Sequence, residues 1–154
     1  MSKDPTEKST RDALEIDSEP GFAVYVTMLA FNKAYKSLLD PLKLTFPQYL
    51  VMLVLWERDD LTVNDLGARL SLDSGTLTPL LKRLEVAGRV RRVRDVTDNR
   101  QVRITLTNPG RLLRTAALSV SQDILRAIGL DLERIQSLNC ELALLRRGLT
   151  VSLK

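Results

Sequence analysis

The sequence predicts a mainly α-helical fold that carries one small β-hairpin. Apolar residues recur at helical spacing over most of the chain, two short β-branched segments flank a turn-forming segment, and Pro and Gly separate these elements. A chain of 154 residues with 44% hydrophobic residues is long enough to bury one sizeable core. We therefore expect a single globular domain.

The N-terminal part is predicted to contain an arm and two helices. Residues 1–18 are mostly charged or small, without a sustained apolar period, and we expect a flexible arm. A long helix is expected from about Pro20 to Asp40, since proline suits a first helical turn and apolar residues then repeat at helical spacing. A second helix begins around Pro47, and its apolar segment YLVMLVLW predicts a place at the centre of the core.

Two shorter helices are expected next. Thr62 has a carboxylate three positions later, which is the pattern of a helix cap. A fourth helix is expected from about Ser74 to the residue before Gly88, because four leucines there have the spacing i, i+3, i+4, i+7. Pro79 by itself would favour a later start with Thr78 as the cap, so this boundary depends on the leucine spacing.

The C-terminal half is predicted to form the hairpin and two more helices. Segments 90–94 and 102–106 are rich in β-branched residues, and DVTDNR between them has turn chemistry. The Asn-Pro pair at 108–109 predicts the start of a fifth helix, which Gly129 ends. Its expected inward-facing residues are Leu112, Leu113, Ala116, Val120, Ile124 and Ile128. A last helix over 132–149 carries a leucine stripe, which together with Ile135 has spacings of three and four, as in a helix that packs along a partner. The leucines of the stripe are Leu132, Leu138, Leu142, Leu145 and Leu149.

Positive charge is concentrated between Lys82 and Arg103. Eight basic residues against three acidic ones give this segment a formal charge of +5, and with a net charge of +4 the remainder of the chain carries −1. Such a local excess is expected of a protein that neutralises nucleic-acid phosphates, and a solvated basic face is the alternative.

The composition disfavours several classes of protein. The chain has no histidine and one cysteine, Cys140, and we find no glycine-rich phosphate loop and no activated-nucleophile motif. We therefore expect no enzymatic activity, no cofactor and no metal. The polar N-terminus and the lack of a long apolar run predict a cytoplasmic protein with no membrane partner. Cys140 falls within the leucine-striped helix, where we expect a small, buried, apolar residue.

A short helix, a turn, a polar-faced helix and a basic hairpin form, in this order, a winged helix-turn-helix unit, whose second helix enters the DNA major groove. We assign residues 61–107 to DNA binding. The candidate DNA-binding residues are Ser74, Thr76, Thr78, Lys82, Arg83, Arg91, Arg94, Asp98 and Arg100. Arg100 is expected at the hairpin tip, held by an ion pair with Asp98 and inserted into a narrow minor groove. An ordinary solvent face with an exposed ion pair, worth about 0–1 kcal/mol, is the alternative.

Three stretches resemble the MarR family of transcriptional regulators, and specifically its organic-hydroperoxide-sensing branch. They read FPQYLVMLVLW, LDSGTLTPLLKRLEVAG and RVRRVRDVTDNRQVRITLT. The resemblance covers roughly residues 20–149 and implies a MarR-type homodimer that binds double-stranded DNA at a pseudo-palindromic operator. In this dimer the first helix and the last two helices form the interface, so the resemblance assigns residues 19–60 and 108–154 to dimerisation. Asp98, Asn99 and Arg100 match the family's D-x-R wing motif, which implies that Arg100 is the minor-groove arginine.

The branch senses peroxide with a cysteine in a motif resembling C-F-x-x-Y, and the matching segment here, residues 21–25, reads GFAVY. The cysteine is therefore replaced by Gly21. Tyr25 and Tyr35 match tyrosines of the branch, but the tyrosine expected before the proline is Phe46. We therefore expect a DNA-binding regulator, a repressor, that is controlled by a small ligand and not by direct cysteine oxidation.

The resemblance places this ligand in an apolar pocket between the first, second and fifth helices. The candidate lining residues are Gly21, Tyr25, Tyr35, Phe46 and Trp56, although aromatic residues at such spacings are more often plain core. Two alternatives stay open: a peroxide-responsive regulator that uses Cys140, and a protein-interaction module that has lost operator binding.

Overall fold

A computed structural model describes residues 15–98 and 100–152. The arm predicted for residues 1–18 therefore lies mostly outside the described residues. Its last part is described, and Ile16–Ser18 form a short 3-10 helix, η1.

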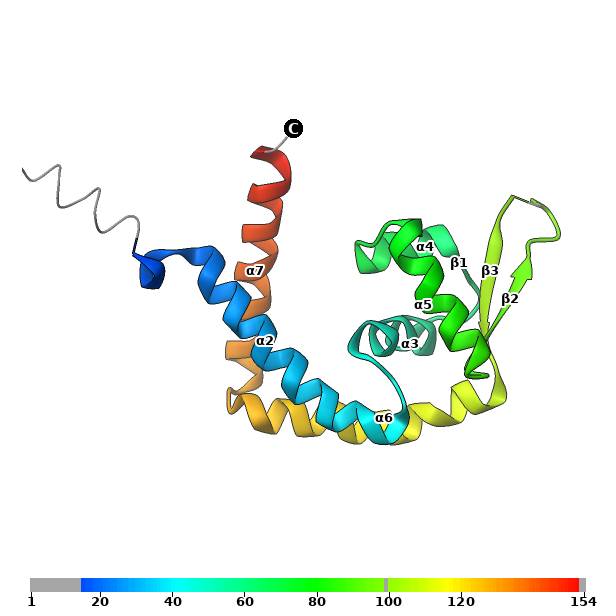
Figure 1. Ribbon diagram of the computed structural model, residues 1–154, viewed down its shortest axis with the longest axis horizontal. Coiled ribbons are helices and arrows are strands. Elements are labelled where there is room, and N and C mark those ends of the chain that lie inside the picture. The colour runs from blue at the N-terminus through cyan, green and yellow to red at the C-terminus, as the bar shows by residue number, and fades with distance from the viewer. Residues whose placement is uncertain (1–14, 99, 153–154) are drawn as a thin grey trace, which may run out of the picture.

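The described residues form six α-helices, with a second 3-10 helix, η2, after the first of them (Figure 1). The helices are α2 (Pro20–Leu39), α3 (Phe46–Glu57), α4 (Val63–Leu70), α5 (Ser74–Val86), α6 (Asn108–Ile128) and α7 (Leu132–Ser152), and η2 spans Asp40–Leu42. In Figure 1, α3, α4, α5 and the sheet form one group, α2 and α7 lie at the other end, and α6 runs along the base between them.

A three-stranded antiparallel sheet has the order β1-β3-β2. Strands β2 (Val90–Arg94) and β3 (Val102–Leu106) pair with Val90 opposite Leu106, so the hairpin prediction is confirmed at both strands. The sequence did not predict β1 (Leu61–Thr62), which pairs with the other edge of β3. A strand of two residues is too short to show an alternating pattern, and only the presence of β3 beside it makes it a strand.

The core is centred on α3, as its apolar sequence predicted. Val51, Met52 and Leu55 of this helix are at most 1% exposed and pack with buried leucines from α4 and α5. The indole Nε1 of Trp56 donates to the carbonyl oxygen of Gly110 at 2.9 Å, which ties α3 to the first turn of α6. A Cβ at Gly110 would overlap the carbonyl oxygen of Arg89, so this turn approaches the start of β2 closely.

Both short helices begin where their sequences predicted. The side chain of Thr62 accepts from the backbone N–H of Asp65 at 3.0 Å, and Asp65 returns the interaction, which completes a capping box. Helix α5 begins at Ser74, with Asp73 as its cap, and Pro79 lies inside the helix. The leucine spacing was therefore the correct guide, because burying four leucines outweighs the hydrogen bond lost at Pro79.

The expected inward face of α6 is partly wrong. Leu112 is 75% exposed and Ala116 is also exposed, whereas Ala117 is only 4% exposed. The buried or half-buried positions 113, 117, 120 and 124 follow spacings of four, three and four, which bring one side of the helix against the core. The predicted set contained residues on both sides of this face.

Cys140 is exposed, so the expectation of a buried cysteine is wrong for the single chain. It lies two residues from both Leu138 and Leu142, and residues two apart are roughly 200° apart around a helix axis. The leucine stripe and the cysteine therefore occupy different faces of α7.

The terminal helices leave apolar surface uncovered. In α2, Tyr25, Val26, Met28 and Leu29 are 40–60% exposed, and the only buried residue is Leu39. No residue of α7 with a described side chain is buried, and its leucine stripe is 43–67% exposed.

No single helix among the described residues is long and apolar enough to cross a membrane. The segment 20–42 and α3 meet the length and composition test only together, and they are bent by 67° at the break between them.

Candidate nucleic-acid interface

Helix α5 separates its apolar and polar residues as predicted. Leu77, Leu80, Leu81 and Leu84 are buried, at 0–9% exposure. Residues 61–107, which include this helix, are called the winged unit below. The polar side chains Ser74, Thr76, Lys82 and Arg83 are exposed, and Thr78 is half-buried. The burial of one face thus leaves an unoccupied polar face on the helix that the sequence identified as the recognition helix.

The first turn of α5 is held by Asp73. Its carboxylate accepts from the backbone N–H of Thr76 at 2.8 Å and from the Thr76 hydroxyl at 3.2 Å, and these bonds lower the pKa of Asp73. The Thr76 hydroxyl therefore already has a partner inside the protein. Ser74 is exposed, whereas Thr78 is half-buried and the Thr76 hydroxyl is bonded to Asp73, so Ser74 is the most accessible of the three predicted hydroxyl groups.

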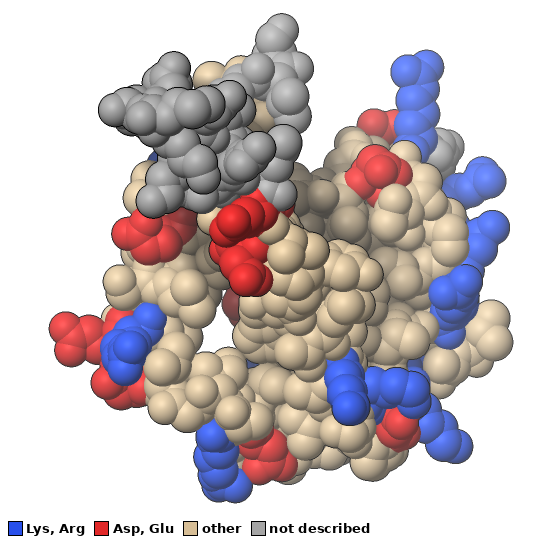
Figure 2. Space-filling view, turned by 60° about the vertical axis from the view of Figure 1, so that its left-hand side comes forward, with Lys and Arg blue, Asp and Glu red and all other residues tan. Residues whose placement is uncertain are grey.

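The wing, β2 and β3 with the turn between them, carries exposed cations. Arg91, Arg94 and Arg100 are all exposed, and within the described part of the chain none of them pairs with a carboxylate. In Figure 2, Lys and Arg side chains project along the right-hand edge of the molecule. Cations without internal partners remain available for phosphates.

The ion pair expected between Arg100 and Asp98 is wrong, although both residues are described. The Oδ1 of Asp98 instead accepts from the backbone N–H of Arg100 at 3.0 Å, and its Oδ2 accepts from the Gln101 side chain at 3.2 Å. The carboxylate is used to close the turn, because backbone N–H groups at a hairpin tip lack partners in the ladder. Asp98 therefore shapes the segment that presents Arg100.

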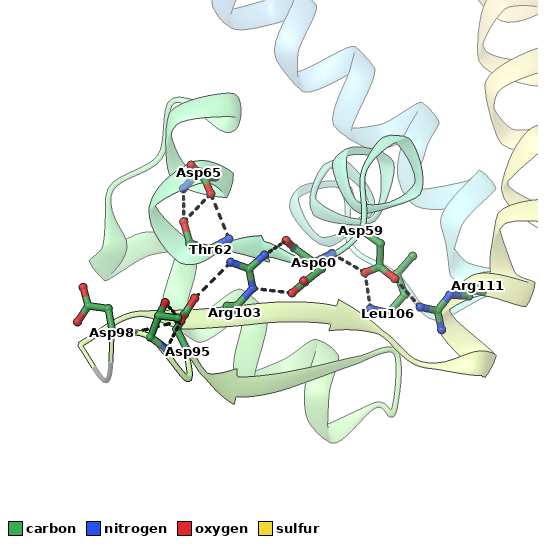
Figure 3. A network of polar contacts seen from close by, with 10 residues as sticks. Asp59, Asp60, Thr62, Asp65, Asp95, Asp98, Arg103, Leu106 and Arg111 are labelled. Carbon is green, nitrogen blue, oxygen red and sulfur yellow. Dashed lines mark hydrogen bonds and ion pairs between the residues drawn. The ribbon is translucent and has the colours of Figure 1, made fainter.

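Arg103, which the sequence analysis did not single out, lies at the centre of a polar network (Figure 3). Its Nε donates to Asp60 Oδ1 at 2.7 Å, its Nη2 donates to the Asp60 carbonyl oxygen at 2.6 Å, and its Nη1 lies 3.3 Å from Asp95 Oδ2. These partners raise the pKa of Arg103. No local pattern could have revealed this, because Asp60 precedes Arg103 by 43 residues.

Asp95 is the most perturbed acid of this network. Hydrogen bonds from the Thr97 hydroxyl at 2.6 Å and the Thr97 backbone N–H at 2.8 Å, followed by the bond from Arg103, lower the pKa of Asp95 to about 2. The carboxylate is thus ionised across the physiological pH range and can hold the wing turn and Arg103 together.

The wing and the helices enclose a hollow of about 210 Å³. Its lining includes Thr78 of α5, Arg92 of β2 and Arg100 of the wing turn. The fold therefore brings two of the predicted DNA-binding residues, Thr78 of α5 and Arg100 of the wing turn, to the same hollow.

The predicted effector residues separate into two groups. Tyr35 and Phe46 stack with ring centroids 4.3 Å apart, and Tyr49, which the sequence analysis did not select, links Tyr35 to Trp56 at centroid distances of 6.0 and 6.3 Å. Burial raises the pKa of Tyr35 and of Tyr49. Gly21 and Tyr25 are exposed on the first turns of α2.

A groove of about 210 Å³ lies between α3 and α6. Tyr49, Leu53 and Trp56 line one side of it, and Arg114 and Leu118 line the other. Of the five predicted effector residues, the groove includes Trp56.

Comparison with known proteins places these features in a wider context. A family model described as "Transcriptional regulator SarA/Rot" matches residues 33–115. The chain is 50% identical to the HTH-type transcriptional regulator TtmR of Methylorubrum extorquens (strain PA1) over 135 residues, which are 88% of this chain and 69% of that protein. It is 43% identical to the organic hydroperoxide resistance transcriptional regulator of Bacillus subtilis (strain 168) over 129 residues, 82% of this chain and 88% of that protein.

A solved structure shares the fold over almost its full length. This is the structure of reduced AbfR bound to DNA, and AbfR is a protein of Staphylococcus epidermidis. It has a TM-score of 0.78 and 32% sequence identity to this chain. The alignment covers 92% of this chain and 99% of that chain.

Proposed function

Because this chain belongs to the SarA/Rot family of MarR-like winged-helix transcriptional regulators, we propose that it binds a pseudo-palindromic DNA operator as a homodimer and represses transcription there. Helix α5 enters the major groove with Ser74, Thr78, Lys82 and Arg83, while Arg100 reaches the adjacent minor groove. Arg91 and Arg94 contact phosphates.

One observation carries this proposal: the exposed cations of the wing lie in the same unit as an exposed polar face of α5. A protein-interaction module has no comparable need for a local positive charge. A duplex supplies the missing anions for the cations and hydrogen-bonding edges for the helix. The relative AbfR was solved with DNA bound, which supports this use of the shared fold.

The exposed apolar residues of α2 and α7 support homodimerisation. A second copy would cover the leucine stripe of α7 and the face of α2 that includes Val26 and Leu29. A two-fold dimer presents two winged units in opposite directions, and such an arrangement matches a DNA site with two inverted halves. A dimer bound over a promoter excludes RNA polymerase, which is the basis for proposing repression.

The groove between α3 and α6 supports control by a small ligand. Tyr49 and Trp56 provide aromatic walls, so an apolar molecule fits its chemistry. The groove lies between α3, at the centre of the core, and α6, the helix that follows the wing. Gly21 offers no thiol for oxidation.

The exposure of Cys140 favours one second candidate, direct sensing of an oxidant at α7. Accessible thiols react with peroxides when they are ionised and suitably placed. Titration with peroxide, described below, separates this mode from control by a ligand.

Selection of bound duplexes from a random pool tests the central proposal. We expect a motif with two inverted half-sites about one helical turn apart, bound with an affinity that falls steeply as salt rises. Fluorescence anisotropy of a labelled duplex carrying the motif, against one with the motif scrambled, gives the specificity. Recovery of no motif, or equal binding to the motif and scrambled duplexes, would show that operator recognition has been lost.

A further inference from the structure

Arg103 belongs to the basic segment by sequence, yet its charge is directed into the protein. We propose that Arg103 is a positioning residue that clamps the wing to the body of the winged unit and so orients Arg100 for the minor groove, without itself contacting phosphate. This inference rests on the proposed function, DNA binding through the wing. Arg103, Asp60 and Asp95 were not among the predicted DNA-binding residues.

The clamp is anchored in the loop between α3 and β1. Two groups of Asp60, a carboxylate oxygen and the carbonyl oxygen, accept from the Arg103 guanidinium at 2.7 and 2.6 Å. The neighbouring carboxylate of Asp59 accepts from the backbone N–H groups of Asp60 and Leu106, both at 2.8 Å, and pairs with Arg111 of α6. The anchor is therefore connected to the end of β3 and to the long helix that follows it.

The other side of the clamp holds the wing turn. Nη1 of Arg103 lies 3.3 Å from Asp95 Oδ2, and the Oδ1 of Asp95 accepts from both the N–H and the hydroxyl of Thr97. The Asp95 N–H donates to the Gln101 carbonyl oxygen at 3.0 Å. Figure 3 shows Arg103 between Asp60 on one side and Asp95 on the other.

The last contacts reach the residue that reads DNA. The N–H of Gln101 donates to the Asp98 carbonyl oxygen at 2.9 Å, and Asp98 Oδ1 accepts from the N–H of Arg100 at 3.0 Å. A continuous series of hydrogen bonds thus runs from the loop at Asp60 to the backbone of Arg100. A wing held in this way loses less conformational freedom when it docks on DNA.

Two carboxylates surround one guanidinium, so Arg103 contributes little net charge toward a phosphate. The two possible roles of Arg103 then predict opposite signs for a change at Asp60. If Arg103 contacted phosphate, loss of the Asp60 charge would free the cation and tighten DNA binding. If Arg103 is the clamp, the same change loosens the wing and weakens binding, although it raises the net charge by one.

The variants are Arg103→Gln and Asp60→Asn, with Glu57→Gln as the matched control. Asp60 has a φ of 60°, which asparagine tolerates well, so the loop conformation is retained. Glu57 is an exposed carboxylate in the same region that pairs with Arg69 of α4 and has no described contact with the wing. Binding to the labelled selected duplex is measured by anisotropy over a salt series.

We expect Arg103→Gln to weaken binding about fivefold or more, and no more than Arg100→Ala does. Asp60→Asn should weaken binding by a smaller factor, because the Asp60 carbonyl oxygen still accepts from Arg103. Glu57→Gln should bind as the parent does or slightly more tightly. In the Arg100→Ala background, Arg103→Gln should add little further loss, because the clamp acts through Arg100.

Hydrogen exchange without DNA supplies a second measurement. In Arg103→Gln, peptides spanning residues 95–101 should exchange faster, while peptides from the core helix α3 should be unchanged. Binding by Asp60→Asn that equals or exceeds that of Glu57→Gln would overturn the clamp, and so would full additivity of Arg103→Gln with Arg100→Ala. If the parent binds no selected duplex, the proposed function fails and this inference fails with it.

Discussion

The winged unit buries most of its leucines, whereas the terminal helices α2 and α7 leave most of theirs exposed. Leu77, Leu81 and Leu84 of α5 are at most 1% exposed, whereas Leu132 and Leu149 of α7 are 67% and 58% exposed. Both sets belong to apolar stripes with spacings of three and four, so spacing alone does not tell whether a stripe is covered by the same chain or by another one. The winged unit closes its core within one chain, and the terminal helices present an apolar surface suited to a second chain.

The largest expected effect comes from removing a leucine of the closed region. Leu84→Ala should lower the free energy of unfolding by about 2–5 kcal/mol, because the side chain is fully buried and leaves a cavity. Leu112→Ala should change it by no more than about 0.5 kcal/mol, since this leucine is 75% exposed. Urea denaturation followed by circular dichroism measures both. Equal losses would show that burial within one chain does not decide which leucines stabilise the fold.

A charge on the open stripe should separate the chains and leave the winged unit folded. Leu142→Glu should weaken the dimer by roughly 2–4 kcal/mol, because a carboxylate would be buried against the partner. Ser137→Glu adds the same charge on the other face of α7 and should leave the dimer intact. Light scattering measures the mass, and far-ultraviolet circular dichroism checks the fold. A monomeric parent that still binds the two-half-site operator tightly would contradict the assignment of the stripe.

Exposed cations of the winged unit should contribute to DNA binding but not to folding. Arg100→Ala and Lys82→Ala should each weaken operator binding by about 1–3 kcal/mol where they read a groove, with a salt slope shallower by about one for a phosphate contact. Arg126→Ala, an exposed cation of α6, is the control. If both variants bind like the control across the salt series, the reading face is placed wrongly.

Acid should weaken the winged unit through its bonded carboxylates. The pKa values of Asp60, Asp65, Asp73 and Asp95 are all lowered, and hydrogen bonds are the main cause in each case. A carboxylate whose pKa is lowered by folding stabilises the fold at pH values above its ordinary pKa of 3.8. For Asp95 this contribution is lost as the pH falls from 3.8 through about 2.

Asp95→Asn tests the acid effect. The parent should be more stable than the variant above pH 3.8, and the difference should shrink as pH falls toward 2. Denaturation measured at several pH values supplies the comparison. A difference that stays constant over this range would mean that the ionised form of Asp95 is not what stabilises the wing.

The smallest effect is expected from peroxide on the terminal helices. The parent and Cys140→Ser should both stay on the labelled operator during titration with cumene hydroperoxide, because Gly21 supplies no sensing sulfur. Release of the parent but not of Cys140→Ser would identify Cys140 as a sensor.

Two engineered forms refine this test. Gly21→Cys should respond slowly, and Gly21→Cys combined with Phe46→Tyr should respond faster, because the added hydroxyl can bond to the sulfur. If the second form responds no faster than the first, the hydroxyl at position 46 has no part in the reaction.

Much of the fold could be predicted because its signals are local. The cap at Thr62, the strands at 90–94 and 102–106 and the leucines of α5 each depend on residues within one turn or one hairpin. The polar face of α5 followed from the same spacing. Errors arose where one helix had several apolar residues to choose from, as when Leu112 was preferred to Ala117.

The exposed cations of the candidate site could be predicted from the sequence, but the ion pairs and hydrogen bonds that hold the wing could not. A concentration of arginines is visible along the chain, and Arg91, Arg94 and Arg100 are indeed exposed. The sequence does not tell which arginines of the segment are paired: Arg92 pairs with Glu85, and Arg103 pairs with Asp60 and Asp95. The expected partner of Arg100, Asp98, serves the turn instead.

The sequence by itself determined the order and limits of most elements, the basic segment and the absence of a thiol at position 21, since these depend on neighbouring residues or on residue identity. Tertiary structure alone decided the strand β1, the aromatic link through Tyr49, the clamp at Arg103 and the exposure of Cys140. Each of these depends on the distance between segments separated along the chain or on the face that a helix turns to its neighbours. Such distances are fixed only when the core packs, because burial selects one face of every helix and brings distant polar groups within hydrogen-bonding range.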